Sequence, residues 1–250
     1  MAQLHTDQAA GLRRLFRAAE GGLVPVVAPS TWDGAETLLD ALVGAYLERG
    51  LHVLVVDASA AAKPASELVR VRLEACIEPL SADVNYLEAR GLIGHFLDAT
   101  GAASALLPAL RQACPQADVI LLFAPVAELA RVLTGGHPCR PIVMVDLQPE
   151  HLTEAYSAMK WLQQRAGCGV FGLLVAGPAR LALVRRMVEQ LTHCAERFLG
   201  AALPAWAAVD PKEGVKATPS AELRRLARDS LQIEPQNRHH ARLEPVPVLT

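Results

Sequence analysis

Several patterns that mark common protein classes are missing from this chain of 250 residues. Its five cysteines are widely spaced and form no C-x-x-C pair; they are Cys76, Cys114, Cys139, Cys168 and Cys194. This spacing argues against a zinc or thiol-exchange motif, and it predicts reduced thiols in a cytoplasm. The formal net charge of −2 provides no basic field, so we expect no nucleic-acid partner.

Signals for membranes, metals and catalysis are equally scarce. No apolar run approaches the roughly 18 residues of a membrane-spanning helix, and the polar start of the chain does not resemble a secretory signal. The eight histidines show no H-E-x-x-H or similar spacing, so no metal ion is expected. Ser30 lacks the G-x-S-x-G context of a hydrolase nucleophile, and we assign no catalytic residue.

Short apolar runs are the main structural signal that is present. They are nearly continuous rather than alternating, as in parallel strands that are covered on both faces. Five runs are clear: Leu23–Ala28, Val53–Val56, Val119–Phe123, Ile142–Val145 and Val170–Val175. Two further runs fit a strand less well: Ala205–Val209 and Val69–Leu73.

Helical patterns lie between these runs. They cover Glu36–Arg49, Ala89–Cys114 with breaks at Gly101 and Pro108, Val126–Leu133, Pro149–Ala166 and Pro178–Leu199. Alternating strands and helices predict an α/β fold of three layers, with a doubly wound and mostly parallel sheet.

The two ends of the chain differ from the middle. Residues 1–20 predict a short amphipathic helix, in which apolar side chains such as Leu12 and Leu15 are set against arginines. Residues 21–234 would form the α/β domain. Residues 235–250, with their prolines, histidines and basic side chains, are expected to be a flexible tail.

Five segments in order resemble the flagellar regulators FlhG (FleN), which are MinD-type members of the ParA/MinD ATPases. The most specific is the segment D-Q-A-A-G-L-R-R-L, which matches the family's N-terminal D-Q-A-x-x-L-R signature. The matching segments are residues 7–15, 45–58, 117–125, 149–160 and 195–200. The resemblance implies the ParA/MinD fold of the SIMIBI class of P-loop NTPases, and family members use ATP and Mg²⁺.

The phosphate-binding loop of that family is degenerate in this chain. The pattern K-G-G-V-G-K-T maps onto Thr31, Trp32, Asp33, Gly34, Ala35, Glu36 and Thr37. Both lysines are replaced, and two glycines that let backbone N–H groups wrap phosphate are Trp32 and Asp33. Exchanging a positive for a negative charge near phosphate costs on the order of several kcal/mol.

The magnesium site of the family has lost residues as well. At the strand end where the family has the aspartate that organises Mg²⁺, this chain has Phe123. The family's second acidic position, which follows the one matched by Asp57, is Ser59 here. We therefore expect no bound ATP or Mg²⁺ and a protein that is not an enzyme. Asp57 is interpreted as a capping or solvent-facing residue, and Thr37 as a residue of the first turn of a helix.

The N-terminal segment carries the predicted partner contact. In FlhG proteins it binds and stimulates FlhF, a GTPase of the signal-recognition type. The resemblance assigns this role to Asp7, Gln8, Leu12, Arg13, Arg14 and Leu15. The leucines would form an apolar stripe and the arginines an electrostatic clamp. The expected function is thus a non-catalytic regulator of flagellar number or placement, with other flagellar components as further candidate partners.

Two other functions and several structural expectations stay open at this point. The chain could be a MinD-type ATPase with an unusual phosphate loop, or a ParA-like subunit of another polar complex. Loss of the loop favours a monomer, or a dimer held by other contacts, over an ATP-dependent dimer. Residues 221–231 predict a helix that packs on the core or is solvated, so membrane contact should be weak or absent. Met159 and Trp161 are expected in the core, and the protein in the cytoplasm, from where it could be recruited to the pole.

Overall fold

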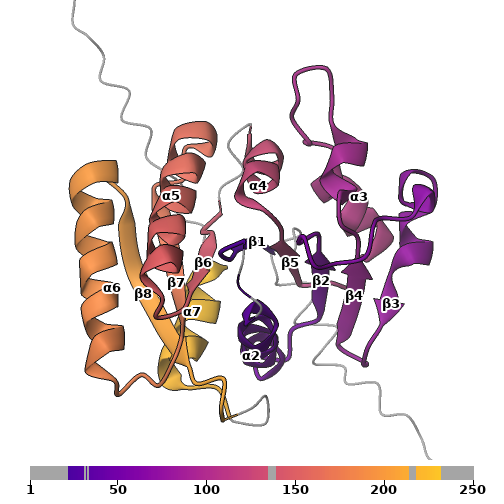
Figure 1. Ribbon diagram of the computed structural model, residues 1–250. Coiled ribbons are helices and arrows are strands. Elements are labelled where there is room, and N and C mark those ends of the chain that lie inside the picture. Colours follow the sequence, from indigo (N-terminus) through magenta and orange to yellow (C-terminus); the bar gives the residue numbers. More distant parts are fainter. Residues whose placement is uncertain (1–21, 31, 33, 135–138, 214–217, 232–250) are drawn as a thin grey trace, which may run out of the picture.

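The computed structural model describes residues 22–30, 32, 34–134, 139–213 and 218–231, and its strands form one sheet (Figure 1). The strands are β1 Gly22–Val27, β2 Val53–Asp57, β3 Glu78–Pro79, β4 Val84–Glu88, β5 Val119–Phe123, β6 Ile142–Val145, β7 Val170–Ala176 and β8 Ala202–Val209. Their order is β3-β4-β2-β5-β1-β6-β7-β8, and every neighbouring pair except β3 and β4 is parallel. The doubly wound parallel sheet is confirmed.

Helices cover both faces of this sheet, which gives the three layers that the sequence predicts (Figure 1). They are α2 Ala35–Leu47, α3 Leu106–Ala113, α4 Val126–Leu133, α5 Pro149–Ala166, α6 Ala182–Cys194 and α7 Ala221–Ser230. Helices α3 to α6 share one hydrophobic core with the sheet, while α2 and α7 share the core on the opposite face. Strands β2 and β5 are buried along their whole length because both cores press on them.

The best-predicted helix, α5, has clear start and stop signals. Pro149 lies at its first position, where a missing backbone N–H costs no helical hydrogen bond. Gly167 ends the helix with a φ of 69°, a left-handed conformation that glycine adopts without steric cost. Such paired signals explain why the sequence places both ends of this helix correctly.

Helix α7 packs on the core, which is one of the two placements that the sequence predicts. Leu223, Leu226 and Ala227 are buried against the sheet, and Leu226 lies over Gly172 of β7. The helix is also joined to α2 by two polar contacts. The hydroxyl groups of Tyr46 and Ser230 lie 2.6 Å apart, and Arg224 Nε donates to Glu48 Oε2 at 2.7 Å. No helix in the described ranges is both long and apolar enough to cross a membrane.

Some predictions about secondary structure are wrong in part, and strand β4 was missed. Residues 69–73 lie in and between two 3₁₀ helices, η1 Glu67–Arg70 and η2 Leu73–Cys76, because the Ser66 hydroxyl accepts from the Leu68 amide and starts a helical turn. Strand β4 was not predicted, since polar residues such as Asn85 interrupt its apolar pattern. Helix α6 begins at Ala182 rather than Pro178, after a turn that joins the Leu181 amide to the Pro178 carbonyl.

The long helix predicted over 89–114 is really two short elements. Gly91 and Gly101 both have a φ of 80°, so the chain turns there. Between these glycines lies the 3₁₀ helix η3 Leu92–Phe96, and the break at Gly101 is confirmed. The predicted break at Pro108 is wrong. This proline lies in the first turn of α3, where its missing N–H removes no intrahelical bond.

Candidate functional site

The carboxyl ends of four neighbouring strands, β2, β5, β1 and β6, meet at one edge of the sheet. Strand β1 lies between β5 and β6, where the succession of strands changes direction. In open α/β sheets this point forms a crevice beyond the strand ends, and ligands bind there. The loop between β1 and α2, which contains the degenerate motif, borders that crevice.

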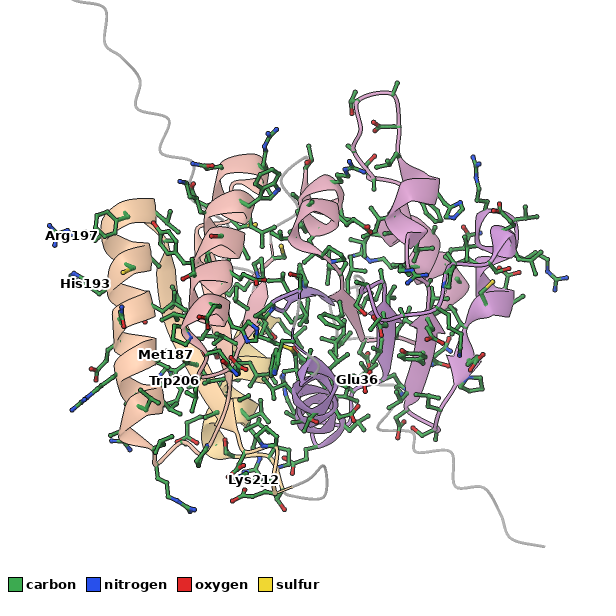
Figure 2. All side chains as sticks on the ribbon, viewed as in Figure 1. Glu36, Met187, His193, Arg197, Trp206 and Lys212 are labelled. Carbon is green, nitrogen blue, oxygen red and sulfur yellow. The ribbon has the colours of Figure 1, made fainter. Side chains whose placement is uncertain are left out.

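A cavity of about 440 Å³ occupies this position. Apolar side chains from β1, β5, β6, α4 and α5 form most of its wall, and Glu36, Asp57 and Glu154 contribute carboxylates. Glu36 comes from the first turn of α2 and is labelled in Figure 2. Of the predicted loop and strand-end residues, Trp32, Ala35, Glu36 and Phe123 all line the cavity, so the structure brings them together.

The indole of Trp32 covers the start of α2. A Cβ atom built on Gly34 would lie 2.5 Å from Trp32 Nε1 and 2.6 Å from Cε2, so the ring rests directly on this glycine. Gly34 is the N-cap of α2 and has no side chain to satisfy the free amides of the helix. A helix N-terminus normally suits an anion. Here the ring, rather than a phosphate, lies against that end of the helix.

A carboxylate of the protein binds the first part of the loop. Glu154 Oε2 accepts from the backbone N–H of Ser30 at 2.9 Å and from its hydroxyl at 3.2 Å. Glu154 belongs to α5, so these bonds join two elements that are far apart in the sequence. The Glu154 carboxylate thus accepts a hydrogen bond from the backbone N–H of Ser30, the residue just before the degenerate motif.

Asp57 has both carboxylate oxygens engaged. Oδ1 accepts from the Ser59 amide at 2.9 Å, and Oδ2 accepts from the Tyr86 hydroxyl at 3.1 Å. Asp57 closes the turn after β2 through Ser59 and caps no described helix, and the alternative of a solvent-facing residue is wrong because its exposed fraction is only 8%. Burial of Tyr86, followed by the charge of Asp57 and this hydrogen bond, raises the pKa of the phenol; Glu88 and Glu36 act in the same direction.

Phe123 lies beside Asp57 at the matching level of the sheet, because the two residues pair in the register of β2 and β5. Its ring is 8% exposed and forms part of the apolar wall. Thr37 lies in the first turn of α2, as predicted. Among the described residues, no group of three or more acidic, histidine or cysteine side chains is arranged to hold a metal ion.

Two residues of the site were missed by the sequence analysis. Trp161 was expected in the core, but its exposed fraction is 43% and it lines the cavity, whereas Met159 is buried as predicted. Glu154 was given no role. Both belong to one face of α5, on which Glu154, Ser157, Ala158 and Trp161 follow at spacings of three, one and three. That helical spacing was the only available signal, and core packing explained it equally well.

Replacing Glu154 with alanine should loosen the loop before α2. Its two bonds to Ser30 are partly exposed, so we expect a loss of about 0.5–1.5 kcal/mol in stability. Amide hydrogen exchange at Ser30 should become faster, because its acceptor is gone. Glu150→Ala on the same helix, whose side chain is exposed, serves as the control. Equal exchange rates in both variants would show that the carboxylate does not hold the loop.

Other predicted site residues lie outside the described residues. These are the partner-binding residues Asp7, Gln8, Leu12, Arg13, Arg14 and Leu15, and the loop residues Thr31 and Asp33. The same applies to the proposed tail at 235–250. Their predicted roles stay predictions.

Comparisons with known proteins identify the fold. No family model matches the sequence, and no curated protein matches it either. Many solved structures are similar, and three of them represent the likeness. McdA from Cyanthece in its apo form has a TM-score of 0.60 at 12% identity, covering 84% of this chain and 100% of its own. A chain of the MinC:MinD cell division protein complex from Aquifex aeolicus has a TM-score of 0.59 at 14% identity, and the match covers 92% of this chain and 99% of its own.

The third is cobyrinic acid a,c-diamide synthase from Mycobacterium smegmatis. With a bound ATP analogue and magnesium, it has a TM-score of 0.54 at 20% identity, covering 83% of this chain and 93% of its own. Identities this low establish the fold and not the activity. Together with the strand order and the flanking helices, they show that the chain has the fold of the MinD/ParA-type P-loop ATPases.

Proposed function

We propose that this protein is a non-catalytic regulator with a MinD/ParA fold, which acts through protein contacts and does not hydrolyse ATP. The observation that supports this proposal most is the placement of Trp32 and Glu154. The indole rests on the N-cap of α2, and the carboxylate takes the Ser30 amide. The indole lies at a helix start that a nucleotide-binding loop must leave open to phosphate, and the Glu154 carboxylate adds a negative charge beside the residue before the motif.

Electrostatics support the same proposal. A triphosphate needs countercharge, which P-loop proteins supply with a lysine and Mg²⁺. Among the described residues, no lysine, arginine or histidine lines the cavity, while Glu36, Asp57 and Glu154 do. A phosphate brought near these carboxylates would be repelled, and no described basic side chain in the lining would offset that repulsion.

Nucleotide binding can be tested by thermal unfolding. A ligand that binds the folded state raises the unfolding free energy, by about 2.7 kcal/mol at a hundredfold excess over Kd. We expect no increase in the melting temperature with millimolar ATP and Mg²⁺. The Mycobacterium smegmatis synthase, whose structure contains an ATP analogue and magnesium, provides a positive control. A clear increase for this protein would instead support an ATPase with an unusual phosphate loop.

We further propose that the partner is an FlhF-type GTPase and that residues 1–20 bind it. This part of the proposal depends on the resemblance of Asp7–Leu15 to the FlhG signature. The protein would then act in flagellar placement or number, at the pole and without an ATP-driven dimer.

The partner contact can be tested separately from nucleotide binding. Removing residues 1–20 leaves every described strand and helix in place, since β1 begins at Gly22. We expect the truncated protein to keep its melting temperature and to lose FlhF binding in a pull-down. The double change of Arg13 and Arg14 to glutamate should also abolish binding. The matched change of Arg185 and Arg186, an adjacent and exposed pair on α6, should have no effect. If the unmodified protein fails to bind FlhF, a subunit of another polar complex becomes the better hypothesis.

A further inference from the structure

The cavity at the strand ends has the size and wall of a small-molecule site. Its volume of about 440 Å³ falls within the range of roughly 300–1,000 Å³ that is typical of ligand pockets. Phe123, Met144 and Trp161 supply large apolar surfaces from three different elements. Such a wall favours an organic ligand with an apolar body.

The charged side chains that line the cavity are all acidic, and Ser30, Ser59 and Ser157 add neutral hydroxyl groups. Glu36, Asp57 and Glu154 line it, and no basic side chain does so within the described part of the chain. Asp57 already accepts from Ser59 and Tyr86, so it contributes its charge rather than a free acceptor. Glu154 uses Oε2 for Ser30, and no described residue donates a hydrogen bond to its Oε1. Glu36 is exposed at the rim.

Aromatic rings next to these carboxylates suit a cation as well. The guanidinium of Arg165 lies 5.2 Å from the centroid of the Trp161 ring, so this indole already has a cationic partner and contributes mainly apolar surface to the cavity. Trp32 and Phe123 add two further rings to the wall. Ring faces and carboxylates together form the surroundings that proteins use for organic ammonium groups.

We propose that this cavity binds a small organic cation, namely a protonated amine on an apolar aromatic or aliphatic body. The body would lie against Phe123, Met144 and Trp161. The ammonium group would donate hydrogen bonds to Glu36 and to Oε1 of Glu154. This inference rests on the proposed loss of triphosphate binding, because both ligands would fill the same space.

Three probes with the same body and different charges test the proposal. Phenethylamine is cationic, 2-phenylethanol is neutral and phenylacetate is anionic at neutral pH. Binding can be followed by tryptophan fluorescence, since two of the three tryptophans, Trp32 and Trp161, line the cavity. Trp206 lies on β8, toward α6 and away from Glu36 (Figure 2), and a Trp206→Phe background removes its signal. Saturation-transfer NMR provides a second measurement.

We expect saturable binding of phenethylamine, weaker binding of the alcohol and none of the acid. Glu36→Gln should weaken amine binding about fivefold, because a carboxylate near an ammonium group is worth about 1 kcal/mol even in water. Glu189→Gln, the same change on an exposed part of α6, should leave it unchanged.

Several outcomes would overturn this inference. These are equal binding of the three probes, no saturable binding of the amine, or equal effects of Glu36→Gln and Glu189→Gln. If neither the amine nor ATP binds, the inference fails and the proposed function stands. Stabilisation by ATP with Mg²⁺ would overturn both.

Discussion

Replacing Phe123 with aspartate, the residue that the resemblance places at this strand end in functional ATPases, is expected to destabilise the protein severely. Removal of a buried aromatic side chain costs about 3–5 kcal/mol. The new carboxyl would also lie at the level of Asp57 on the neighbouring strand, in a cavity without a described basic side chain. Its charge would therefore add to the cost.

The effect of charge can be separated from that of the lost ring by Phe123→Asn, which has nearly the same shape. Burial and the neighbouring Asp57 should raise the pKa of the new carboxyl above its unfolded value of about 3.9. A raised folded pKa means that the aspartate and asparagine variants are equally stable at low pH. As the pH rises, the aspartate variant becomes less stable, by about 1.4 kcal/mol for each tenfold difference in proton affinity between the folded and unfolded states.

Urea unfolding of both variants between pH 4 and 8 measures this difference. We expect it to reach about 1–3 kcal/mol at neutral pH. Millimolar Mg²⁺ should not reduce it. A selective gain in stability of the aspartate variant with Mg²⁺, and not with an equal ionic strength of KCl, would mean that the site still holds a divalent cation. That result would contradict the proposed loss of the nucleotide site.

Replacing Leu226 with alanine is expected to lower the unfolding free energy by about 2–5 kcal/mol. The side chain of Leu226 is 1% exposed and lies against Gly172 of β7. Its removal leaves a cavity between α7 and the sheet. The measurement is chemical unfolding, and a loss below about 1 kcal/mol would show that α7 is not docked in solution.

Two further variants sharpen this test of α7. Arg228→Ala alters the exposed face of the same helix and should change stability by no more than about 0.5 kcal/mol. Gly172→Ala should be destabilising by itself, because its Cβ would lie 2.6 Å from Leu226 Cδ1. In the Leu226→Ala background that clash is absent. The double variant should therefore be more stable than the sum of the two single effects predicts.

The sequence predicts the sheet well because burial on both faces leaves a strong pattern. β5, β6 and α5 lie almost where the apolar runs and the Pro149 start signal place them. Strand β4 and the turn near Gly91 escape prediction because they depend on tertiary pairing, such as the bonds from the Ala89 amide to the Asp57 carbonyl and from the Arg90 amide to the Lys63 carbonyl. Local propensity contains little information about either.

The site divides in the same way. The sequence itself shows that the loop lacks the lysines and two of the glycines, and that Phe123 replaces the strand-end aspartate. What occupies their place cannot be seen there. The contact between Trp32 and Gly34 requires a particular direction of the indole. The bond from Ser30 to Glu154 joins residues 124 positions apart, which no spacing rule could reveal.

The attachment of α7 to α2 has a consequence for how the chain matures on the ribosome. Helix α2 lies in the first quarter of this sequence and α7 in its last eighth, and both are needed to cover one face of the sheet. Until α7 leaves the exit tunnel, the apolar face of β7 and β8 that it covers stays exposed in the nascent protein. Synthesis proceeds at about 5–20 residues per second, so this surface is open to chaperones for seconds before closure.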